Sequence, residues 1–364
     1  MKVKDIIQEL EKAAPPALQE SFDNAGLCTG NPDLDISSAL VTVDVTEEVI
    51  DEAIGRKAHL IVAHHPLIFQ GLKKITGASI AERCVIKAIQ NNIAIYCVHT
   101  NLDNVVNGVN TALAGKLNLK KQRFLSPARQ QLCKLVTFVP SAHAQTVREA
   151  LFGAGAGHIG NYDSCSFNLQ GEGTFRGSEG TKPFVGEPGK HHTEPETRIE
   201  TIFPKYLQTK ILSALKGVHP YEEPAVDLYL LENANPLAGS GMIGELEKPV
   251  TEKEFMTMIK TALNAGNIRH SPLTSRTIQR VAVCGGSGSF LIHDALKAGA
   301  DAFVTGDIKY HQFSEPEGRM LLIDAGHYET EQFTKNIFYE IIRKKFPTFA
   351  VHFSEVRTNP INYF

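Results

Sequence analysis

Histidine and acidic residues that could bind divalent metal ions occur in three short segments of this chain. Imidazole nitrogens and carboxylate oxygens are protein groups that zinc, iron, manganese and cobalt accept as ligands. The candidates are His64, His65, Asp103, His327 and Glu331. Three imidazoles and two carboxylates fit two ions better than one, and a pair of ions that shares a water molecule makes a hydrolytic centre.

The first segment, His64-His65-Pro66, directly follows the apolar run Leu60–Ala63, which predicts a short buried strand. Successive strand residues point to opposite sides, so these two histidines cannot both be ordinary core residues of one face. They could reach two metals, or one could bind a metal while the other supports it. The alternative is a surface or structural pair that binds nothing.

The other two segments also follow predicted strands. His99-Thr100-Asn101-Leu102-Asp103 follows the run 93–98, and His327 follows the run 320–324. Glu331 lies four residues after His327, which places both on one face of a helix. Each segment has a plainer interpretation, a helix-capping loop or a solvated helical pair. Together they favour a metal site, because open α/β sheets bind ligands at the carboxyl ends of their strands.

Strands and helices alternate in the two terminal parts of the chain, and this order is typical of a parallel α/β sheet. The predicted strands are 39–45, 60–63, 93–98, 280–284, 302–305, 320–324 and 349–353. Helices are predicted at 2–13, 47–57, 78–91, 252–263, 290–298 and 329–345. We therefore expect a split α/β domain with a mostly parallel sheet, whose halves are residues 1–130 and 234–364.

The intervening residues 131–233 show the order β-α-β, β-α-β, which predicts a small α+β insert of ferredoxin type. Within it, 182–196 is rich in proline, glycine and charge and is interpreted as a loop. Residues 235–244 are expected to be the linker that returns to the first domain.

Further residues after predicted strands could complete a site. Asp307 and His311 are candidates for moving a proton. The turn Gly285–Gly288 could bind an anion with its amides, or it could be an ordinary tight turn. Asp23 could line a pocket, or it could serve turn formation. GxSxG and Walker A motifs are absent from the sequence, so serine-hydrolase and P-loop chemistry have no support.

The composition of the chain disfavours several classes of protein. The 364 residues contain 37 Lys and Arg against 40 Asp and Glu, a formal net charge of −3, which argues against a strongly basic nucleic-acid binder. No apolar run is long enough to predict a membrane span, and the charged N-terminus does not resemble a signal peptide. The six cysteines form no CxxC pair. We therefore expect a cytoplasmic protein with reduced cysteines and no membrane partner.

Six collinear motifs resemble those of the interacting-factor-three-like family, the GTP cyclohydrolase 1 type 2 homologues. They are SFDNAGLCTG (21–30), AHHPLIF (63–69), VHTNLDNVVNG (98–108), VCGGSG (283–288), VTGDIKYH (304–311) and DAGHYETE (324–331). Two segments of the insert, 157–167 and 217–229, are similar to the PII-like or CutA-like domain of longer bacterial members.

This resemblance implies two divalent metal ions per chain, with zinc expected and iron, manganese or cobalt as alternatives. The implied ligands are His64, His65, Asp103, His327 and Glu331. It also implies a ring-shaped homohexamer whose metal sites face an internal cavity.

The first functional hypothesis is a metal-dependent hydrolase that acts on a small molecule or nucleotide and resembles a GTP cyclohydrolase. The second is a non-enzymatic, metal-binding regulatory or chaperone-like ring whose insert senses a ligand. A nuclease that uses two metals is a third hypothesis, disfavoured by the balanced charge. Turnover that requires Asp103 or Glu331 would separate the first hypothesis from the second.

Overall fold

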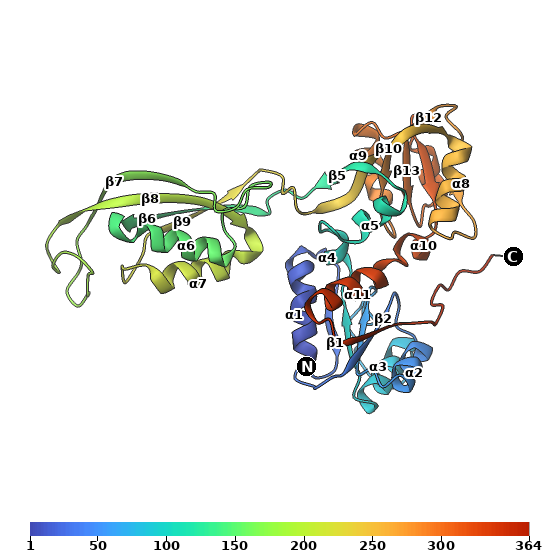
Figure 1. Ribbon diagram of the computed structural model, residues 1–364, viewed down its shortest axis with the longest axis horizontal. Coiled ribbons are helices and arrows are strands. Elements are labelled where there is room, and N and C mark those ends of the chain that lie inside the picture. The colour runs from blue at the N-terminus through green and yellow to red at the C-terminus, as the bar shows by residue number, and fades with distance from the viewer. Residues whose placement is uncertain (364) are drawn as a thin grey trace. The chain divides into compact units, whose positions relative to one another are not determined.

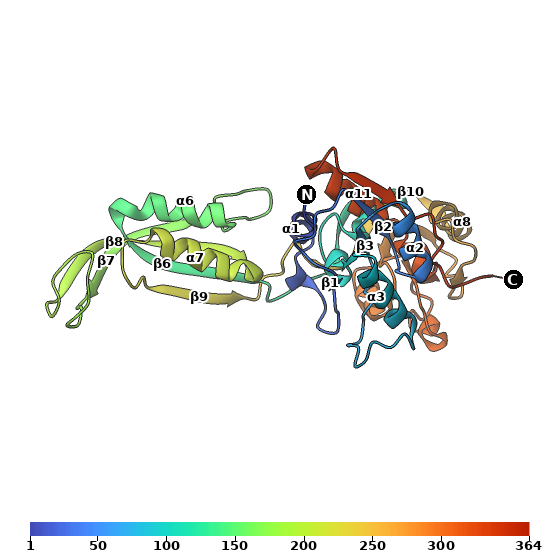
Figure 2. The ribbon, with the colours of Figure 1, turned by 90° about the horizontal axis from the view of Figure 1, so that it is seen from below.

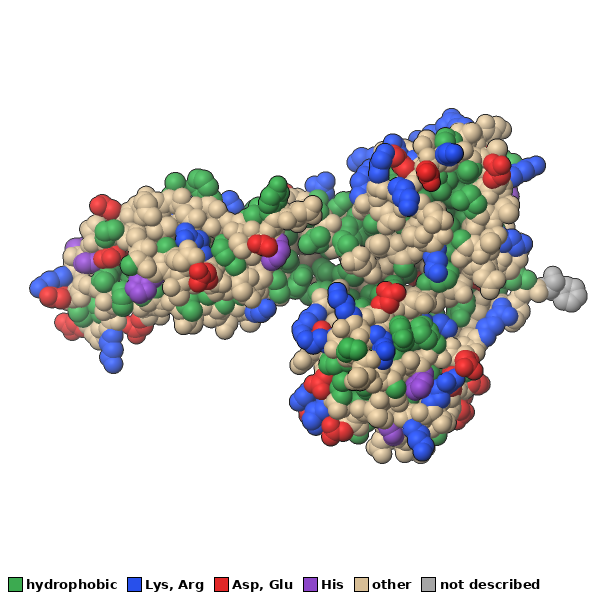
Figure 3. Space-filling model, viewed as in Figure 1, with side chains coloured by type: hydrophobic (Ala, Val, Ile, Leu, Met, Phe, Trp, Pro, Cys, Tyr) green, Lys and Arg blue, Asp and Glu red, His purple; other side chains and the backbone are tan. Residues whose placement is uncertain are grey.

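The computed structural model describes residues 1–363. The chain divides into two compact units: unit 1 joins Met1–Ser126 to the segment from Leu237 onward, and unit 2 is Pro127–Pro236 (Figure 1). None of the helices within the described residues combines the length and apolarity needed to cross a bilayer. Positive and negative side chains are interspersed on the face of each unit that Figure 3 shows.

The first sheet of unit 1 has five strands in the order β1-β4-β3-β2-β15. Their bounds are β1 (Gly26–Thr29), β2 (Ser38–Thr42), β3 (Leu60–Ala63), β4 (Ala94–Cys97) and β15 (Ala350–Phe353). β15, β2, β3 and β4 run parallel, and β1 pairs with β4 in the antiparallel sense. The last strand therefore completes a sheet that the first hundred residues begin.

Helices cover both faces of this sheet, which explains why its central strands are apolar without alternation. α2 (Glu47–Gly55) and α3 (Ile80–Gln90) lie on one face, and α1 (Val3–Ala13) and α11 (Thr334–Lys345) lie on the other (Figures 1 and 2). In α1, the buried residues recur at helical spacing: Val3, Ile6, Ile7 and Leu10. α2 and α3 begin at side-chain caps, Thr46 and Ser79, which accept hydrogen bonds from Val49 N and Glu82 N.

The second sheet of unit 1 has six strands in the order β11-β14-β13-β12-β10-β5. Their bounds are β5 (Lys120–Pro127), β10 (Gly239–Thr251), β11 (Arg269–His270), β12 (Thr277–Val283), β13 (Ala302–Thr305) and β14 (Leu321–Asp324). β12, β13 and β14 run parallel, whereas β10 and β11 are antiparallel to their neighbours β12 and β14. Buried residues of α5 (Val109–Lys116) and α8 (Glu252–Ala262) pack on one face, and α9 (Ile292–Lys297) packs on the other.

Two expectations about this unit were wrong. One mostly parallel sheet was predicted, but the parallel strands are divided between two mixed sheets, because alternation along the chain does not say which distant strands pair. The sequence predicts a linker at 235–244, but β10 begins at Gly239. Its first residues, Gly-Ser-Gly, carry little strand propensity, and the pairing of β10 with β12 begins only after them, at Met242.

Unit 2 contains four strands and two helices in the order β-α-β-β-α-β. They are β6 (Leu132–Pro140), α6 (Ala144–Ala154), β7 (Phe167–Phe175), β8 (His192–Pro204), α7 (Gln208–Val218) and β9 (Val226–Leu231). The strand order is β7-β8-β6-β9, and every neighbouring pair is antiparallel. Both helices pack on the same face of the sheet (Figures 1 and 2). The loop predicted at 182–196 ends earlier than expected, because β8 extends back to His192 along β7.

Short helices complete the chain. α4 (Thr100–Asp103) and α10 (His327–Glu331) each carry candidate ligands. The helix predicted at 329–345 is two helices, α10 and α11, which are separated at Gln332–Phe333. The 3-10 turns are η1 (Pro16–Leu18), η2 (Ser141–His143), η3 (Lys205–Leu207), η4 (Ser289–Leu291) and η5 (Tyr310–Ser314).

Candidate metal centre

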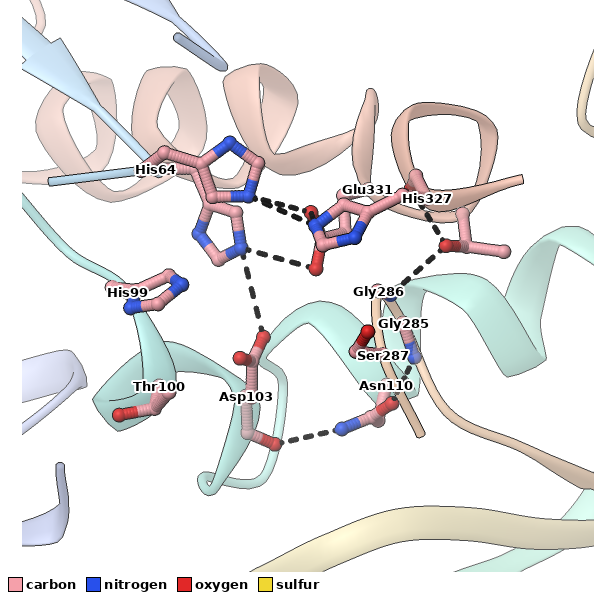
Figure 4. A network of polar contacts seen from close by, with 12 residues as sticks. His64, His99, Thr100, Asp103, Asn110, Gly285, Gly286, Ser287, His327 and Glu331 are labelled. Carbon is pink, nitrogen blue, oxygen red and sulfur yellow. Dashed lines mark hydrogen bonds and ion pairs between the residues drawn. The ribbon is translucent and has the colours of Figure 1, made fainter. Parts of the chain in front are cut away.

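The carboxyl ends of the two sheets of unit 1 supply the candidate ligands. His64 and His65 directly follow β3, and α4, which ends at Asp103, follows β4. His327 and Glu331 lie on α10, three residues after β14 ends. The structure brings all five side chains together at one place, although they come from opposite ends of the chain (Figure 4).

Glu331 lies at the centre of this group. Its Oε2 is 2.9 Å from His65 Nε2 and 3.1 Å from His327 Nε2. Its Oε1 is 3.6 Å from His64 Nε2, and the same nitrogen is 3.8 Å from Asp103 Oδ1. Ligand atoms of His64, His65 and Glu331 all lie within 4.8 Å of one another, which makes this group a possible metal site.

The three imidazoles are held so that each presents Nε2 to the centre. His64 Nδ1 donates to the Val98 carbonyl at 2.9 Å. His65 Nδ1 donates to Asp44 and His327 Nδ1 donates to Asp307, both at 2.6 Å. A hydrogen bond donated by Nδ1 turns Nε2 toward the centre, the orientation found in many metal-binding histidines.

The ionisable side chains of this group shift one another's pKa values strongly. Burial, followed by the charge of Glu331, raises the pKa of Asp103 well above its usual value. Although burial opposes it, hydrogen bonds to Asp44 and Glu331 raise the pKa of His65 to about 9. Likewise, against burial, Asp307 and Glu331 raise the pKa of His327 to about 11. A bound cation would relieve the repulsion between the buried carboxylates without protonating the histidines.

Buried polar atoms without hydrogen-bond partners indicate that these residues fit a metal centre. Among residues 1–363, His64 Nε2 and Asp103 Oδ1 are two of the three buried side-chain polar atoms that have no hydrogen-bond partner. In addition, His65 Nε2 and His327 Nε2 face each other at 3.2 Å. Buried polar atoms without partners are costly, and a divalent ion would satisfy lone pairs that no described donor reaches.

His99 adds a fourth imidazole beside this group. Its ring centroid lies 5.4 Å from that of His64 and 5.5 Å from that of His65, and Figure 4 shows it pointing toward the same space. Asp23 accepts the Nδ1 hydrogen at 2.8 Å and also accepts hydrogen bonds from the Thr100 backbone and hydroxyl. Against the effect of burial, these bonds lower the pKa of Asp23 to about 2. Asp23 thus orients His99, in addition to the turn contact that it makes with Asn24.

The glycine turn after β12 approaches the group from another side. Gly285 N donates to Asn110 Oδ1, Gly286 N to Thr330 Oγ1 and Gly288 N to Thr305 Oγ1 (2.8–3.0 Å). Side chains therefore occupy three of the amides that could have bound an anion, which favours the tight-turn alternative. Gly286 has φ +59, and a Cβ there would lie 2.2 Å from Glu331 Oε1, so only glycine allows this close approach.

A pocket of about 670 Å³ opens onto the ligands His65, Asp103, His327 and Glu331. Three phenylalanines line it, Phe22 and Phe69 from the first half of unit 1 and Phe290 from the second. They are 64%, 47% and 66% exposed, respectively. None of the described lining residues is lysine or arginine. The pocket therefore offers apolar rings and metal-ligand chemistry rather than a cationic surface.

The two candidates for proton transfer lie in different surroundings. Asp307 accepts a hydrogen bond from His327, the candidate ligand that it contacts, and another from Ser287 Oγ at 2.8 Å. His311 is exposed in η5 beside Tyr310 and does not line the pocket. Asp44, the partner of His65, was not predicted, because the strand expected at 39–45 includes it, whereas β2 ends at Thr42.

A family model for Duf34/NIF3 (NGG1p interacting factor 3) matches residues 1–360. The chain belongs to the Duf34/NIF3 family. It is 39% identical over 366 residues to the GTP cyclohydrolase 1 type 2 homolog of Bacillus subtilis, covering 99% of this chain and 98% of that protein. It is 41% identical over 368 residues to the protein of the same name from Halalkalibacterium halodurans, covering 98% of each.

Solved structures of Duf34/NIF3 relatives share the fold along the whole chain. A Bacillus cereus protein related to NIF3 is 37% identical with a TM-score of 0.88, covering 100% of this chain and 99% of the other. A Staphylococcus aureus protein is 29% identical with a TM-score of 0.77 and the same coverage. The relatives therefore include the insert as well as the two halves of unit 1.

Proposed function

We propose that this Duf34/NIF3 protein is a metal-dependent hydrolase that binds two divalent ions per chain, with zinc as the expected metal. The proposed ligands are His64, His65, Asp103, His327 and Glu331. The observation that carries the proposal is the convergence of three imidazole Nε2 atoms and two carboxylates at one place beside the pocket, with His64 Nε2 and Asp103 Oδ1 buried and lacking hydrogen bonds.

Two bound divalent ions would supply Lewis acidity and a water of lowered pKa for hydrolysis. The protein's own residues prepare that chemistry. Asp44 and Asp307 hold the rings of His65 and His327 in place. His99, whose Nδ1 is held by Asp23, leaves its Nε2 for a hydrogen bond to the reacting part of the substrate.

The pocket supports a substrate with a planar, largely uncharged ring. Phe22 and Phe69, whose ring centroids are 6.4 Å apart, provide apolar surface on one side, and Phe290 provides it from the other half of unit 1. The name of the relatives points to a purine nucleotide. Because no described residue of the pocket lining is lysine or arginine, we propose that the base is recognised here and that phosphates contribute little to binding.

The test is metal content per chain and turnover, measured for the wild type and for Asp103→Asn and Glu331→Gln. Glu340→Gln, on an exposed position of α11, is the matched control. About two ions in the wild type and the control, with clear loss in both ligand variants, is the expected result.

Guanosine and GTP are then compared as substrates of the zinc-loaded protein. We expect hydrolysis of both at similar kcat/KM and its loss in His99→Asn, which should keep its metal. No bound metal after reconstitution with zinc, manganese or iron would overturn the proposal. Two bound ions without turnover of any purine would instead favour a metal-binding regulatory or chaperone-like ring.

We further propose that the chain assembles into a homohexameric ring and that unit 2 is a ferredoxin-like domain of the PII or CutA type. The antiparallel strand order β7-β8-β6-β9 with both helices on one face supports the second part. Analytical ultracentrifugation tests the first part, and a monomeric species at micromolar concentration would contradict it.

A further inference from the structure

Unit 2 contains a second cavity, of about 750 Å³, which lies entirely within that unit. Residues Val139 and Ile199 face the helices α6 and α7, so their strand neighbours Phe138 and Arg198 point to the opposite face of the sheet. Phe138 and Arg198 are paired across β6 and β8, and both line the cavity. The cavity therefore sits on the sheet face that the helices leave uncovered.

Two segments close this cavity over the sheet. The connection between β7 and β8 contributes Arg176 and Phe184, and the segment after α7 contributes Tyr221. The Phe175 and Tyr221 rings lie 5.8 Å apart and form part of an aromatic wall. A hollow of this size with aromatic walls matches the usual dimensions of a small-molecule site.

One buried carboxylate points into the cavity with an unused oxygen. Glu196 is 7% exposed and lines the cavity. Its Oε1 accepts a hydrogen bond from the Tyr221 hydroxyl at 2.7 Å. Oε2 accepts none from the residues described, and the space it occupies depends on Gly173, where a Cβ would lie 2.1 Å from it. Oε2 is therefore free to accept a hydrogen bond from a ligand that enters the cavity.

The charges around the cavity favour a positively charged ligand. Four glutamates line it, namely Glu172, Glu196, Glu222 and Glu223, against the two arginines Arg176 and Arg198. Arg198 already pairs with Glu200 at 2.9 Å and lies over the Phe138 ring. Glu200, which does not line the cavity, offsets part of the charge of Arg198, and glutamates outnumber arginines in the lining.

We propose that this cavity binds a small organic ammonium ion with an apolar body. The ammonium group donates to Glu196 Oε2, and the Phe175 and Tyr221 rings contact the cation and the apolar body. Nothing in this proposal depends on the candidate metal centre, which lies in unit 1. The insert would thus bind its own ligand.

The experiment uses the full-length protein, treated with chelator or loaded with zinc, and titrates it with 2-phenylethylammonium by calorimetry. Two probes of matched size, 2-phenylethanol and phenylacetate, replace the ammonium by a neutral and a negative group. Glu196→Gln keeps an acceptor for Tyr221 but removes the charge. Glu149→Gln, on the exposed surface of α6, is the control, and circular dichroism checks that both variants are folded.

We expect binding of the ammonium probe alone, at equal affinity with and without zinc, and a roughly 10- to 100-fold loss in Glu196→Gln. Gly173→Ala, which displaces the same carboxylate without changing charge, should also weaken binding. Equal binding of the alcohol, unchanged affinity in Glu196→Gln, or no heat with millimolar ammonium probe would overturn the proposal.

Discussion

Gly286→Ala tests whether the turn after β12 is shaped to admit the Glu331 carboxylate. Gly286 has φ +59, and the added Cβ would lie 2.2 Å from Glu331 Oε1 and 3.2 Å from His327 Nε2. Real Cβ atoms do not come this close to a carboxylate oxygen, so Glu331 must move away from the histidines. Since Glu331 contacts His64, His65 and His327, its displacement should disturb the whole proposed metal centre.

The size of the effect has two parts that a control separates. Placing alanine in the left-handed region costs about 1 to 2 kcal/mol of stability wherever it occurs. Gly318→Ala carries this cost alone, because Gly318 has φ +72 and nothing lies within 4 Å of its added Cβ. Only Gly286→Ala should also lower zinc affinity, by at least the roughly 10- to 100-fold typical of disturbed support for a ligand.

The assay is zinc affinity by competition with a chromophoric chelator, together with metal content by mass spectrometry. Urea unfolding in excess EDTA measures the stability of each variant without metal. We expect Gly318→Ala to lose stability and keep wild-type zinc affinity, and Gly286→Ala to lose both. Wild-type zinc affinity in a folded Gly286→Ala protein would refute the idea that this turn positions the Glu331 carboxylate for metal.

Three other changes test separate parts of unit 1. Asp44→Asn weakens the acceptor that holds His65, and zinc affinity should fall roughly 10- to 100-fold in the same competition; an unchanged affinity would count against this role. The pKa of Glu52 is lowered, against burial, by hydrogen bonds from Ser354 and the backbone of residue 355. Its stabilisation is therefore present above the unfolded pKa of about 4.3 and lost as pH falls through the lower folded value. Urea curves of Glu52→Gln and the wild type should differ at neutral pH and converge in acid, and a pH-independent difference would contradict this. Thr251→Ala, which removes the capping box of α8, should cost about 1 kcal/mol in urea unfolding, and Thr251→Ser should recover most of it.

The candidate ligands could be predicted from sequence because each follows a strand with a clear apolar run. Leu60–Ala63 is a fully buried strand with the predicted bounds, and His64 and His65 follow it directly. The four-residue spacing of His327 and Glu331 predicted their common helix face, and α10 spans these two residues. Such local patterns suffice when the strand ends are brought together by the fold.

The residues that hold the candidate ligands in place could not be predicted in the same way. Asp44 was assigned to the interior of a strand that in fact ends at Thr42, and its contact with His65 depends on the conformation after that end. The sequence leaves the glycine turn open between an anion site and a tight turn, because it does not show that side chains occupy the amides of Gly285 and Gly286. Pairing of distant strands, such as β15 with β2, is likewise a property of the folded chain alone.

The contact between His65 and Glu331 joins residues 266 positions apart, which has a consequence for biosynthesis. At synthesis rates of about 5–20 residues per second, the ribosome needs roughly 13 to 53 seconds to progress from one to the other. During that interval the emerging polypeptide contains His65 without its acidic counterpart, so a high-affinity centre cannot yet exist. If the proposed centre binds metal, loading would therefore follow synthesis of Glu331, and prematurely terminated or C-terminally clipped products should be metal-free.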